Sequence, residues 1–357
     1  MTFHASNGLT SIFSSATKNA AHLSRGVSSI FMTWFPLDVP MIAARSLMWR
    51  RSRWLPVQVA VDRDAVSQEH PNADLVWTVP GVLEVHKVLG SGSFGEVWQC
   101  EADGYSGLVA VKVFKDLHEV NYEHRARECH LLTLLQHPNL VKVFNVIYGT
   151  PSAILMEVCL GGTLAQLIHD LQQRAAFNSL SLSARIQGTV GVVACLEYLH
   201  ASQVVHRDVK PSNLLLTSSC RPGLKFLPQV KLADFGLARS SSQHMSKGVG
   251  TLLYMAPEVM QGNEYSFPVD IYSFSMSLYE FLTGSKPYSG MPDLRRLPTF
   301  VQAVDSGVRP MLQHLQHVPE VCDILRECWS GECVRRPSAR SLADSLRALA
   351  PSACEQA

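Results

Sequence analysis

A glycine-rich hexapeptide could bring backbone amides close to the phosphates of a nucleotide. It reads Gly90-Ser91-Gly92-Ser93-Phe94-Gly95, in the spacing G-x-G-x-x-G. Glycine has no side chain to obstruct such an approach. The same spacing occurs in dinucleotide-binding folds, where the glycines open a helix. Here Glu96 to Gln99 continues as a strand, so the sequence predicts a glycine-rich hairpin and excludes a nucleotide-dependent oxidoreductase.

A lysine follows this loop in an apolar segment. Lys112 lies within Leu108 to Phe114, where an ammonium group without an anionic partner is costly to desolvate. Glu128 lies further along, in a segment whose leucines recur at helical spacing, so it shares the helix face turned to the core. The pattern predicts a Lys112–Glu128 pair, although a Lys/Glu combination taken alone is more often a surface pair.

Three further motifs follow in order along the chain. They read His206-Arg207-Asp208-Val209-Lys210-Pro211-Ser212-Asn213, then Asp234-Phe235-Gly236, then Ala256-Pro257-Glu258. Together with the glycine-rich loop and Lys112, they make the region from about Val82 to Leu349 resemble the eukaryotic protein kinase family. The resemblance implies an α+β, two-lobed protein kinase fold. Its N-lobe would be a small antiparallel β-sheet with one main helix, and its C-lobe would be larger and α-helical.

The resemblance also implies a catalytic centre. Asp208 would accept or orient the proton of the substrate hydroxyl, and Lys210 would meet the γ-phosphate of ATP. Asn213 and Asp234 would bind Mg²⁺, for which Mn²⁺ can substitute. These residue types suit phosphoryl transfer, which needs positioning and neutralisation of negative charge more than covalent chemistry.

The ATP site implied by the resemblance joins the glycine-rich loop to an adenine pocket. Three apolar side chains would enclose the adenine ring, a hinge at Met156 to Gly162 would offer backbone groups to it, and Lys112 would hold the α- and β-phosphates. The whole set is Leu89, Gly90, Ser91, Gly92, Ser93, Phe94, Gly95, Val97, Ala110, Lys112, Glu128, Met156, Glu157, Cys159 and Leu215.

Two residues indicate the substrate class. Lys210 is typical of serine/threonine kinases, and Thr251 matches the threonine of their substrate-docking loop. The resemblance therefore implies transfer of the γ-phosphate of Mg-ATP to Ser or Thr hydroxyls of protein substrates, in intracellular signalling. The string from Asp270 to Phe274, with Cys328-Trp329 and Arg336-Pro337-Ser338, is most similar to the tyrosine-kinase-like branch of these enzymes.

Other residues would support or regulate this centre. Asp270 would accept backbone amides of the catalytic loop, and Arg336 would pair with Glu258. Phosphorylation of the activation segment, by an upstream kinase or by autophosphorylation in trans, would raise activity by pairing with Arg207 and Arg239. The candidate phosphosites are Ser240, Ser241, Ser242 and Ser246.

Two alternatives remain open at this point. A pseudokinase scaffold would bind partners without turnover, although the intact motifs argue against it. Tyrosine or dual-specificity phosphorylation would change only the substrate class.

The elements that must position these residues change in type along the chain, with strands first and helices later. The expected strands are Val82 to Leu89, Glu96 to Cys100, Leu108 to Phe114, Val141 to Val146 and Ile154 to Val158. The expected helices are Glu119 to Gln136, Ser183 to His200, Asp270 to Thr283, Val318 to Trp329 and Ser338 to Leu349. We expect an extension at residues 1–80, a kinase domain at 81–350 (N-lobe 81–158, C-lobe 159–350) and a tail at 351–357.

Composition bounds what surrounds this domain. The chain has 357 residues, of which 46% are hydrophobic and 17% charged, and its formal net charge of +1 argues against a globally basic nucleic-acid binder. Residues 1–60 hold six basic residues and one acid, a net +5, which leaves −4 for the rest.

The same features indicate a location. Nine cysteines without a C-x-x-C pair fit a reducing compartment, and no apolar run is long enough for a transmembrane helix. We therefore expect a cytoplasmic protein. Organellar targeting is the alternative, because the first 37 residues are rich in serine and lack acids.

Overall fold

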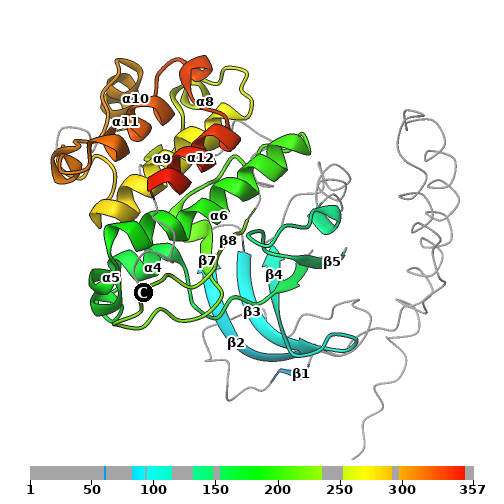
Figure 1. Cartoon of the computed structure of the whole chain (residues 1–357). Helices are drawn as coiled ribbons and strands as arrows, with labels where there is room; N and C mark the ends of the chain where they lie inside the picture. The colour runs from blue at the N-terminus through cyan, green and yellow to red at the C-terminus, as the bar shows by residue number, and fades with distance from the viewer. Residues whose placement is uncertain are drawn as a thin grey trace, which may run out of the picture. The chain divides into compact units, whose positions relative to one another are not determined.

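The computed structural model places six of its eight described strands in one lobe and most of its described helices in another, as expected for a two-lobed fold (Figure 1). All of the elements below fall within one compact unit, Leu55–Ala357. The structure describes residues 60–61, 83–92, 95–114, 132–147, 153–234, 252–291 and 297–349.

The N-lobe is a six-stranded sheet with the order β1-β2-β3-β4-β6-β5. Its strands are β1 (Ala60–Val61), β2 (Leu83–Gly92), β3 (Gly95–Ala102), β4 (Leu108–Phe114), β5 (Val143–Ile147) and β6 (Ala153–Glu157). Neighbouring strands from β2 onward pair antiparallel, whereas β1 pairs parallel to Glu84 and Val85 on β2. All five expected strands are found, and β4 matches at both ends. The short strand β1 was not expected, because it lies in the predicted extension.

Alternation along β4 separates its packing face from its functional face. Val109, Val111 and Val113 are buried in one apolar cluster with Trp98. Ala110 and Lys112 point to the opposite face, because successive side chains of a strand alternate. The sequence therefore sets Lys112 on the sheet face away from the cluster of valines.

The glycine-rich segment joins β2 to β3 as a hairpin, as predicted, and not as a strand-to-helix turn. Gly95 opens β3 with φ of 154°, and a Cβ atom at this position would lie 1.8 Å from the carbonyl oxygen of Val113. Only glycine permits so close an approach of β3 to β4.

The C-lobe packs its helices around α9 (Pro268–Thr283), which is buried over nearly its whole length (Figure 1). Pro268 stands in its first turn and Gly284 ends it with φ of 72°, which are the residues expected at a helix start and stop. The other α-helices in the described ranges are α4 (Leu164–His169), α5 (Arg174–Ser179), α6 (Leu182–Ala201), α8 (Pro257–Met260), α10 (Leu297–Asp305), α11 (Pro319–Cys328) and α12 (Ala339–Leu349).

The expected helices after residue 180 are found within two residues of their predicted ends. The expected helix Glu119 to Gln136 lies outside the described residues except for its last few positions. None of the helices in the described ranges is both long and apolar enough to cross a membrane.

A two-stranded hairpin in the C-lobe carries the catalytic motifs at its ends. It pairs β7 (Leu214–Leu216) with β8 (Val230–Leu232). Asn213 precedes β7 and Asp234 follows β8, and the N–H of Ala233 donates to the Asn213 carbonyl oxygen at 2.8 Å. The antiparallel pairing thus brings two residues that are 21 positions apart to the same end of the hairpin.

Candidate active site

The loop that carries Asp208 is anchored to the buried helix α9. Asp270 accepts the backbone N–H groups of His206 and Arg207, each at 2.8 Å, and contacts Nε2 of His200 at 2.9 Å. Arg207 has φ of 70°, a strained backbone for a residue with a side chain, which the anchored loop maintains. The predicted capping role of Asp270 is confirmed.

His206 is a structural residue of this loop. Its side chain is fully buried, and burial lowers its pKa, with the nearby charge of Asp270 acting in the opposite sense. The Asp208 N–H donates to His206 Nδ1 at 3.3 Å, so Nδ1 carries no proton. The proton of the neutral ring is therefore on Nε2, which donates to the Ala233 carbonyl oxygen at 3.1 Å. His206 links the catalytic loop to the residue before Asp234.

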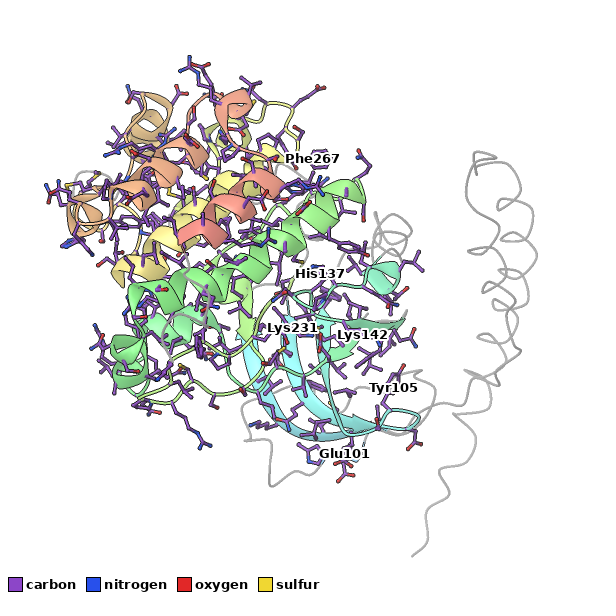
Figure 2. The ribbon with its side chains drawn as sticks, viewed as in Figure 1. Glu101, Tyr105, His137, Lys142, Lys231 and Phe267 are labelled. Carbon is purple, nitrogen blue, oxygen red and sulfur yellow. The ribbon has the colours of Figure 1, made fainter. Side chains whose placement is uncertain are left out.

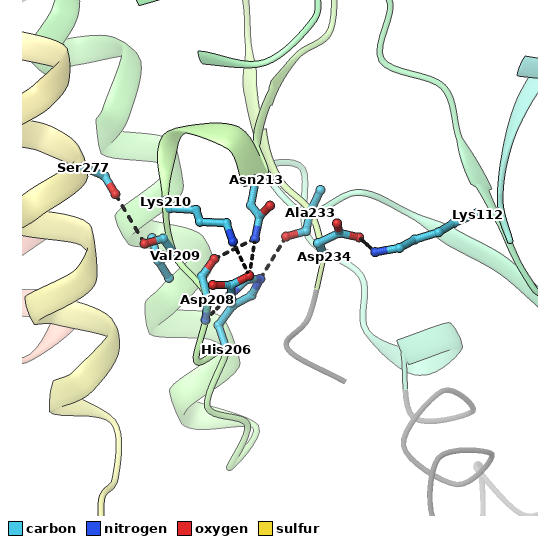
Figure 3. Close-up of polar contacts among 9 residues, drawn as sticks. All are labelled: Lys112, His206, Asp208, Val209, Lys210, Asn213, Ala233, Asp234 and Ser277. Carbon is cyan, nitrogen blue, oxygen red and sulfur yellow. Dashed lines mark hydrogen bonds and ion pairs between the residues drawn. The ribbon is translucent and has the colours of Figure 1, made fainter. Parts of the chain in front are cut away.

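Two side chains from the same loop orient the Asp208 carboxylate (Figure 3). Lys210 Nζ lies 2.9 Å from Asp208 Oδ2. Asn213 Nδ2 donates to that oxygen at 3.0 Å and to the Asp208 carbonyl oxygen at 2.8 Å. This arrangement fixes the carboxylate in one orientation and sets a cation beside it.

Lys112 reaches from the N-lobe to the C-lobe. Its Nζ donates to Asp234 Oδ1 at 2.5 Å, and the lysine side chain is largely buried (Figure 3). Asp234 has φ of 56°, a second strained position in the centre. The predicted partner, Glu128, lies outside the described residues, so the Lys112–Glu128 pair stays a prediction. The described anion beside Lys112 is Asp234.

The residues expected to bind a metal fit a hard divalent cation. The amide nitrogen of Asn213 is directed at Asp208, so its amide oxygen is turned the other way. That oxygen and the Asp234 carboxylate lie at the same end of the β7–β8 hairpin and are of the type that such a cation prefers as ligands. The described residues hold no cluster of three or more His, Cys, Asp or Glu with metal-binding geometry. Few protein ligands are expected where Mg²⁺ keeps waters and is shared with substrate phosphates.

The residues expected around adenine come from four strands. Val97 on β3 lies opposite Gly90 and Lys112, and Ala110 on β4 lies opposite Met156 on β6. Leu215 on β7 forms a bridge with Thr163, just after the hinge. The structure thus links the apolar residues of the expected pocket to neighbouring strands and to the hinge.

The hinge is tied to β8 by an ion pair that the sequence did not indicate. Lys231 Nζ donates to both oxygens of Glu157, at 2.6 and 2.8 Å, and the Lys142 N–H donates to Oε1 at 2.7 Å. Figure 2 shows Lys231 and Lys142 where the sheet meets the helical lobe. Burial, followed by the charge of Glu157, raises the pKa of the neighbouring Cys159 thiol to about 11.

Leu89 lies on β2 as expected, at a half-buried position. Ser91 and Gly92 are exposed on the same strand, which runs three residues past its predicted end. Other predicted residues lie outside the described part of the chain and stay predictions. These are Ser93, Phe94, Glu128, Thr251, Ser240, Ser241, Ser242 and Ser246.

A second acid of α9 was missed by the sequence reasoning. Glu280 is buried and contacts His169 and Tyr254. The sequence did contain an indication of a buried acid, because α9 has two acidic residues, no basic residue and an otherwise largely apolar sequence. An acid at such a position needs a polar partner.

Comparison with known proteins gives a consistent result. The profile of the protein kinase domain matches residues 83–346. Mitogen-activated protein kinase kinase kinase 7 of Homo sapiens is 32% identical over 265 residues, which cover 72% of this chain and 40% of that protein. Mitogen-activated protein kinase kinase kinase 12 of Rattus norvegicus is 31% identical over 297 residues, which cover 80% of this chain and 30% of that protein.

A probable serine/threonine-protein kinase of Dictyostelium discoideum is 28% identical over 271 residues, covering 75% of this chain and 28% of that protein. The chain therefore spans less than half the length of these relatives.

Proposed function

The chain belongs to the protein kinase family, and on that basis we propose that it transfers the γ-phosphate of Mg-ATP to serine and threonine hydroxyls of protein substrates. The observation that carries this proposal is the single network of Lys112, Asp208, Lys210, Asn213 and Asp234. Each predicted catalytic or metal-binding side chain contacts another member of the set. Ala233, which directly precedes Asp234, joins its two halves, because its N–H donates to the Asn213 carbonyl oxygen and its own carbonyl oxygen contacts His206 Nε2.

The chemistry of the proposed reaction follows from these contacts. Bound ATP with its divalent cation supplies the phosphoryl group. Asp208, held by Lys210 and Asn213, orients the substrate hydroxyl and accepts its proton. Lys210 also neutralises charge at the transferred group, and Lys112 neutralises the remaining phosphates. Both lysines are already held by carboxylates of the centre, Lys112 by Asp234 and Lys210 by Asp208, so little reorganisation of the protein would be needed during transfer.

The substrate class is supported by two observations. Lys210 contacts the catalytic aspartate, as in the serine/threonine class that the sequence resembles. Among the relatives, one is named as a probable serine/threonine-protein kinase and two as mitogen-activated protein kinase kinase kinases. We propose protein substrates in a signalling pathway, with Mg²⁺ as the cofactor cation and Mn²⁺ as a substitute.

Regulation and location are part of the proposal. Phosphorylation among Ser240 to Ser246, by an upstream kinase or in trans, would raise activity. Mass spectrometry that finds none of these serines modified in a fully active preparation would contradict this. We propose a cytoplasmic location, which fractionation of cells expressing a tagged full-length chain would test.

The test of the proposed function is incorporation of radiolabelled phosphate from ATP into myelin basic protein and casein. The wild type should label either protein, and Asp208→Ala should not. Equal labelling of substrate by the wild type and by Asp208→Ala would contradict the proposed catalytic activity and favour the pseudokinase alternative. Phosphoamino-acid analysis of the product should give phosphoserine and phosphothreonine, and mainly phosphotyrosine would overturn the substrate class.

A further inference from the structure

The connection between β7 and β8, residues 217–229, lies against two helices of the C-lobe (Figure 1). The Gly223 N–H donates to Oγ of Ser179, the last residue of α5, at 3.2 Å. Leu227 packs closely on α6, where a Cβ atom at Gly188 would lie 2.6 Å from the leucine side chain. The connection is therefore anchored to both α5 and α6.

A β-turn in this connection brings a cation close to an apolar side chain. The turn runs from Arg221 to Leu224, and the Leu224 N–H donates to the Arg221 carbonyl oxygen at 3.3 Å. Pro222 precedes Gly223, which has φ of 84°, so both the sequence and the backbone are those of a type II turn. The two residues after the turn are a lysine and a phenylalanine.

The side chains of this turn and of the two residues after it face solvent. Leu224 has 39% of its surface exposed, and Phe226 has 54%. Arg221 and Lys225 are exposed as well. No ion pair between described residues includes either cation. The connection thus offers two charges and two large apolar groups that the described fold leaves open.

The start of α5 adds a third cation and a third apolar residue. Leu171 is 82% exposed and stands three residues before Arg174, the exposed first residue of α5. Residues 171–191 and 217–229 contain no acid, and the preceding Asp170 accepts the Gln172 N–H at 2.9 Å. We call this region the β7–β8 surface. Its members are Leu171, Arg174, Arg221, Leu224, Lys225 and Phe226.

This combination of residue types indicates a surface for a partner. Single exposed apolar residues are ordinary, whereas a group of them beside cations is typical of protein–protein contacts, in which aromatic residues and arginine are enriched. Carboxylates complement the three cations, and bulky apolar side chains complement the three apolar residues. The occupant must therefore carry both kinds of group.

The charge of the chain favours another protein as this occupant. Residues 1–60 are themselves net +5, so they do not complement a cationic surface. Three cations are fewer than the cluster of about 4–8 that marks a lipid-binding patch. An interface of ordinary size takes about 20–30 residues a side, so six exposed side chains fit a short segment better than a folded domain.

We propose that the β7–β8 surface docks a short segment of another protein that carries acidic and bulky apolar residues. The carboxylates of the segment pair with the three cations, and its apolar side chains cover the three apolar residues. The surface lies at the other end of the hairpin from Asn213 and Asp234, so a docked segment leaves those residues uncovered. This inference goes beyond the proposed kinase function, because such binding needs no ATP.

The first experiment selects a random peptide library, displayed on phage, against the full chain without nucleotide. The enriched peptides should combine Asp or Glu with Leu, Ile, Phe or Trp, and the most enriched one is then labelled for fluorescence anisotropy. We expect Arg221→Glu with Lys225→Glu to weaken its binding about tenfold, because each exchange replaces attraction with repulsion. Phe226→Ser should also weaken binding about tenfold, because it removes apolar contact area.

Matched controls place the same changes at other exposed positions. Arg326→Glu with Arg335→Glu changes the net charge by the same amount, on α11 and on η6 (Cys333–Arg335). Val334→Ser removes part of an apolar side chain that is 85% exposed. Neither control should change the affinity for the peptide. All of the substituted side chains are exposed, so every variant should melt at the temperature of the wild type in circular dichroism.

The proposal is overturned if the enriched peptides lack acids, or if the wild type and the Arg221→Glu, Lys225→Glu variant bind the peptide equally well. Sedimentation with phosphatidylserine vesicles that needs these two cations, without peptide enrichment, would assign the surface to a membrane instead. A dimer mass in light scattering that is lost in Phe226→Ser would assign it to a second copy of this chain. Failure of the proposed kinase function is a separate result, seen when the wild type labels substrate no better than Asp208→Ala.

Discussion

Lys231 on β8 donates to both carboxylate oxygens of Glu157 on the hinge, at 2.6 and 2.8 Å. Glu157 is the last residue of β6, and Lys231 stands three residues before Asp234. The pair therefore links the strand expected to face adenine with β8, which leads to Asp234, the aspartate expected to bind the metal. Both side chains are mostly buried, so solvent screens the pair less than it screens a surface pair.

Breaking this pair should weaken ATP binding. We expect Glu157→Gln to raise the KM for ATP by about tenfold, because a partly buried lysine loses a charged partner and the hinge loses its ion pair with β8. The charge exchange Glu157→Lys with Lys231→Glu should recover part of the loss. Steady-state kinetics at saturating protein substrate measure both effects.

The control for this prediction is Arg340→Gln. Arg340 pairs with Glu197 at 2.9 Å but is exposed, and exposed ion pairs contribute little. A KM for ATP that is the same in wild type and Glu157→Gln would show that ATP binding does not depend on the ion pair between Glu157 and Lys231.

A buried ion pair in the C-lobe should contribute strongly to stability. Arg336 is buried and donates to both oxygens of Glu258, at 2.6 and 2.8 Å, and to the Pro268 carbonyl oxygen at 3.1 Å. We expect Arg336→Ala to lower the free energy of unfolding by about 3–5 kcal/mol, because it leaves the Glu258 carboxylate without its main partner. Urea denaturation measures this.

The exposed pair of Arg326 and Asp323 supplies the matched arginine control. Arg326→Ala should cost less than about 1 kcal/mol. Similar losses in the two variants would contradict the role assigned to burial.

Much of this centre could be predicted because its motifs are local. The eight residues from His206 to Asn213 lie together in sequence, and the alternation in β4 sets the face of Lys112. The Arg336–Glu258 pair and the capping role of Asp270 were also predicted from the resemblance, and the structure confirms both.

The contacts that were missed join segments far apart in the chain. Lys231 and Glu157 are 74 residues apart, and His169 and Glu280 are 111 apart. Periodicity places each residue on a face of its own element, but it does not say which distant element covers that face. The unexpected strand β1 is a similar case, since two residues carry no recognisable period.

The hinge thiol should react slowly and with a steep pH dependence. With a pKa of about 11, Cys159 is thiolate in only about one molecule in a thousand at pH 8. Because the thiolate is the reactive form, its alkylation rate should rise about tenfold per pH unit until pH approaches 11. Peptide mass spectrometry after timed iodoacetamide treatment follows each cysteine separately.

The exposed Cys333 serves as the internal reference in that experiment. A rate at Cys159 that reaches its plateau near pH 9 would contradict the raised pKa. Glu157→Gln should speed the reaction at a given pH, because it removes a negative charge that raises the pKa.

The central claim is that Asp208 carries the chemistry of phosphoryl transfer, and Asp208→Asn tests it most directly. This variant keeps the size of the side chain but removes its ability to accept a proton. Phosphate transfer from radiolabelled Mg-ATP to myelin basic protein should fall by about 10²–10⁴ in kcat, with ATP affinity unchanged. A kcat for Asp208→Asn equal to that of the wild type would contradict the account.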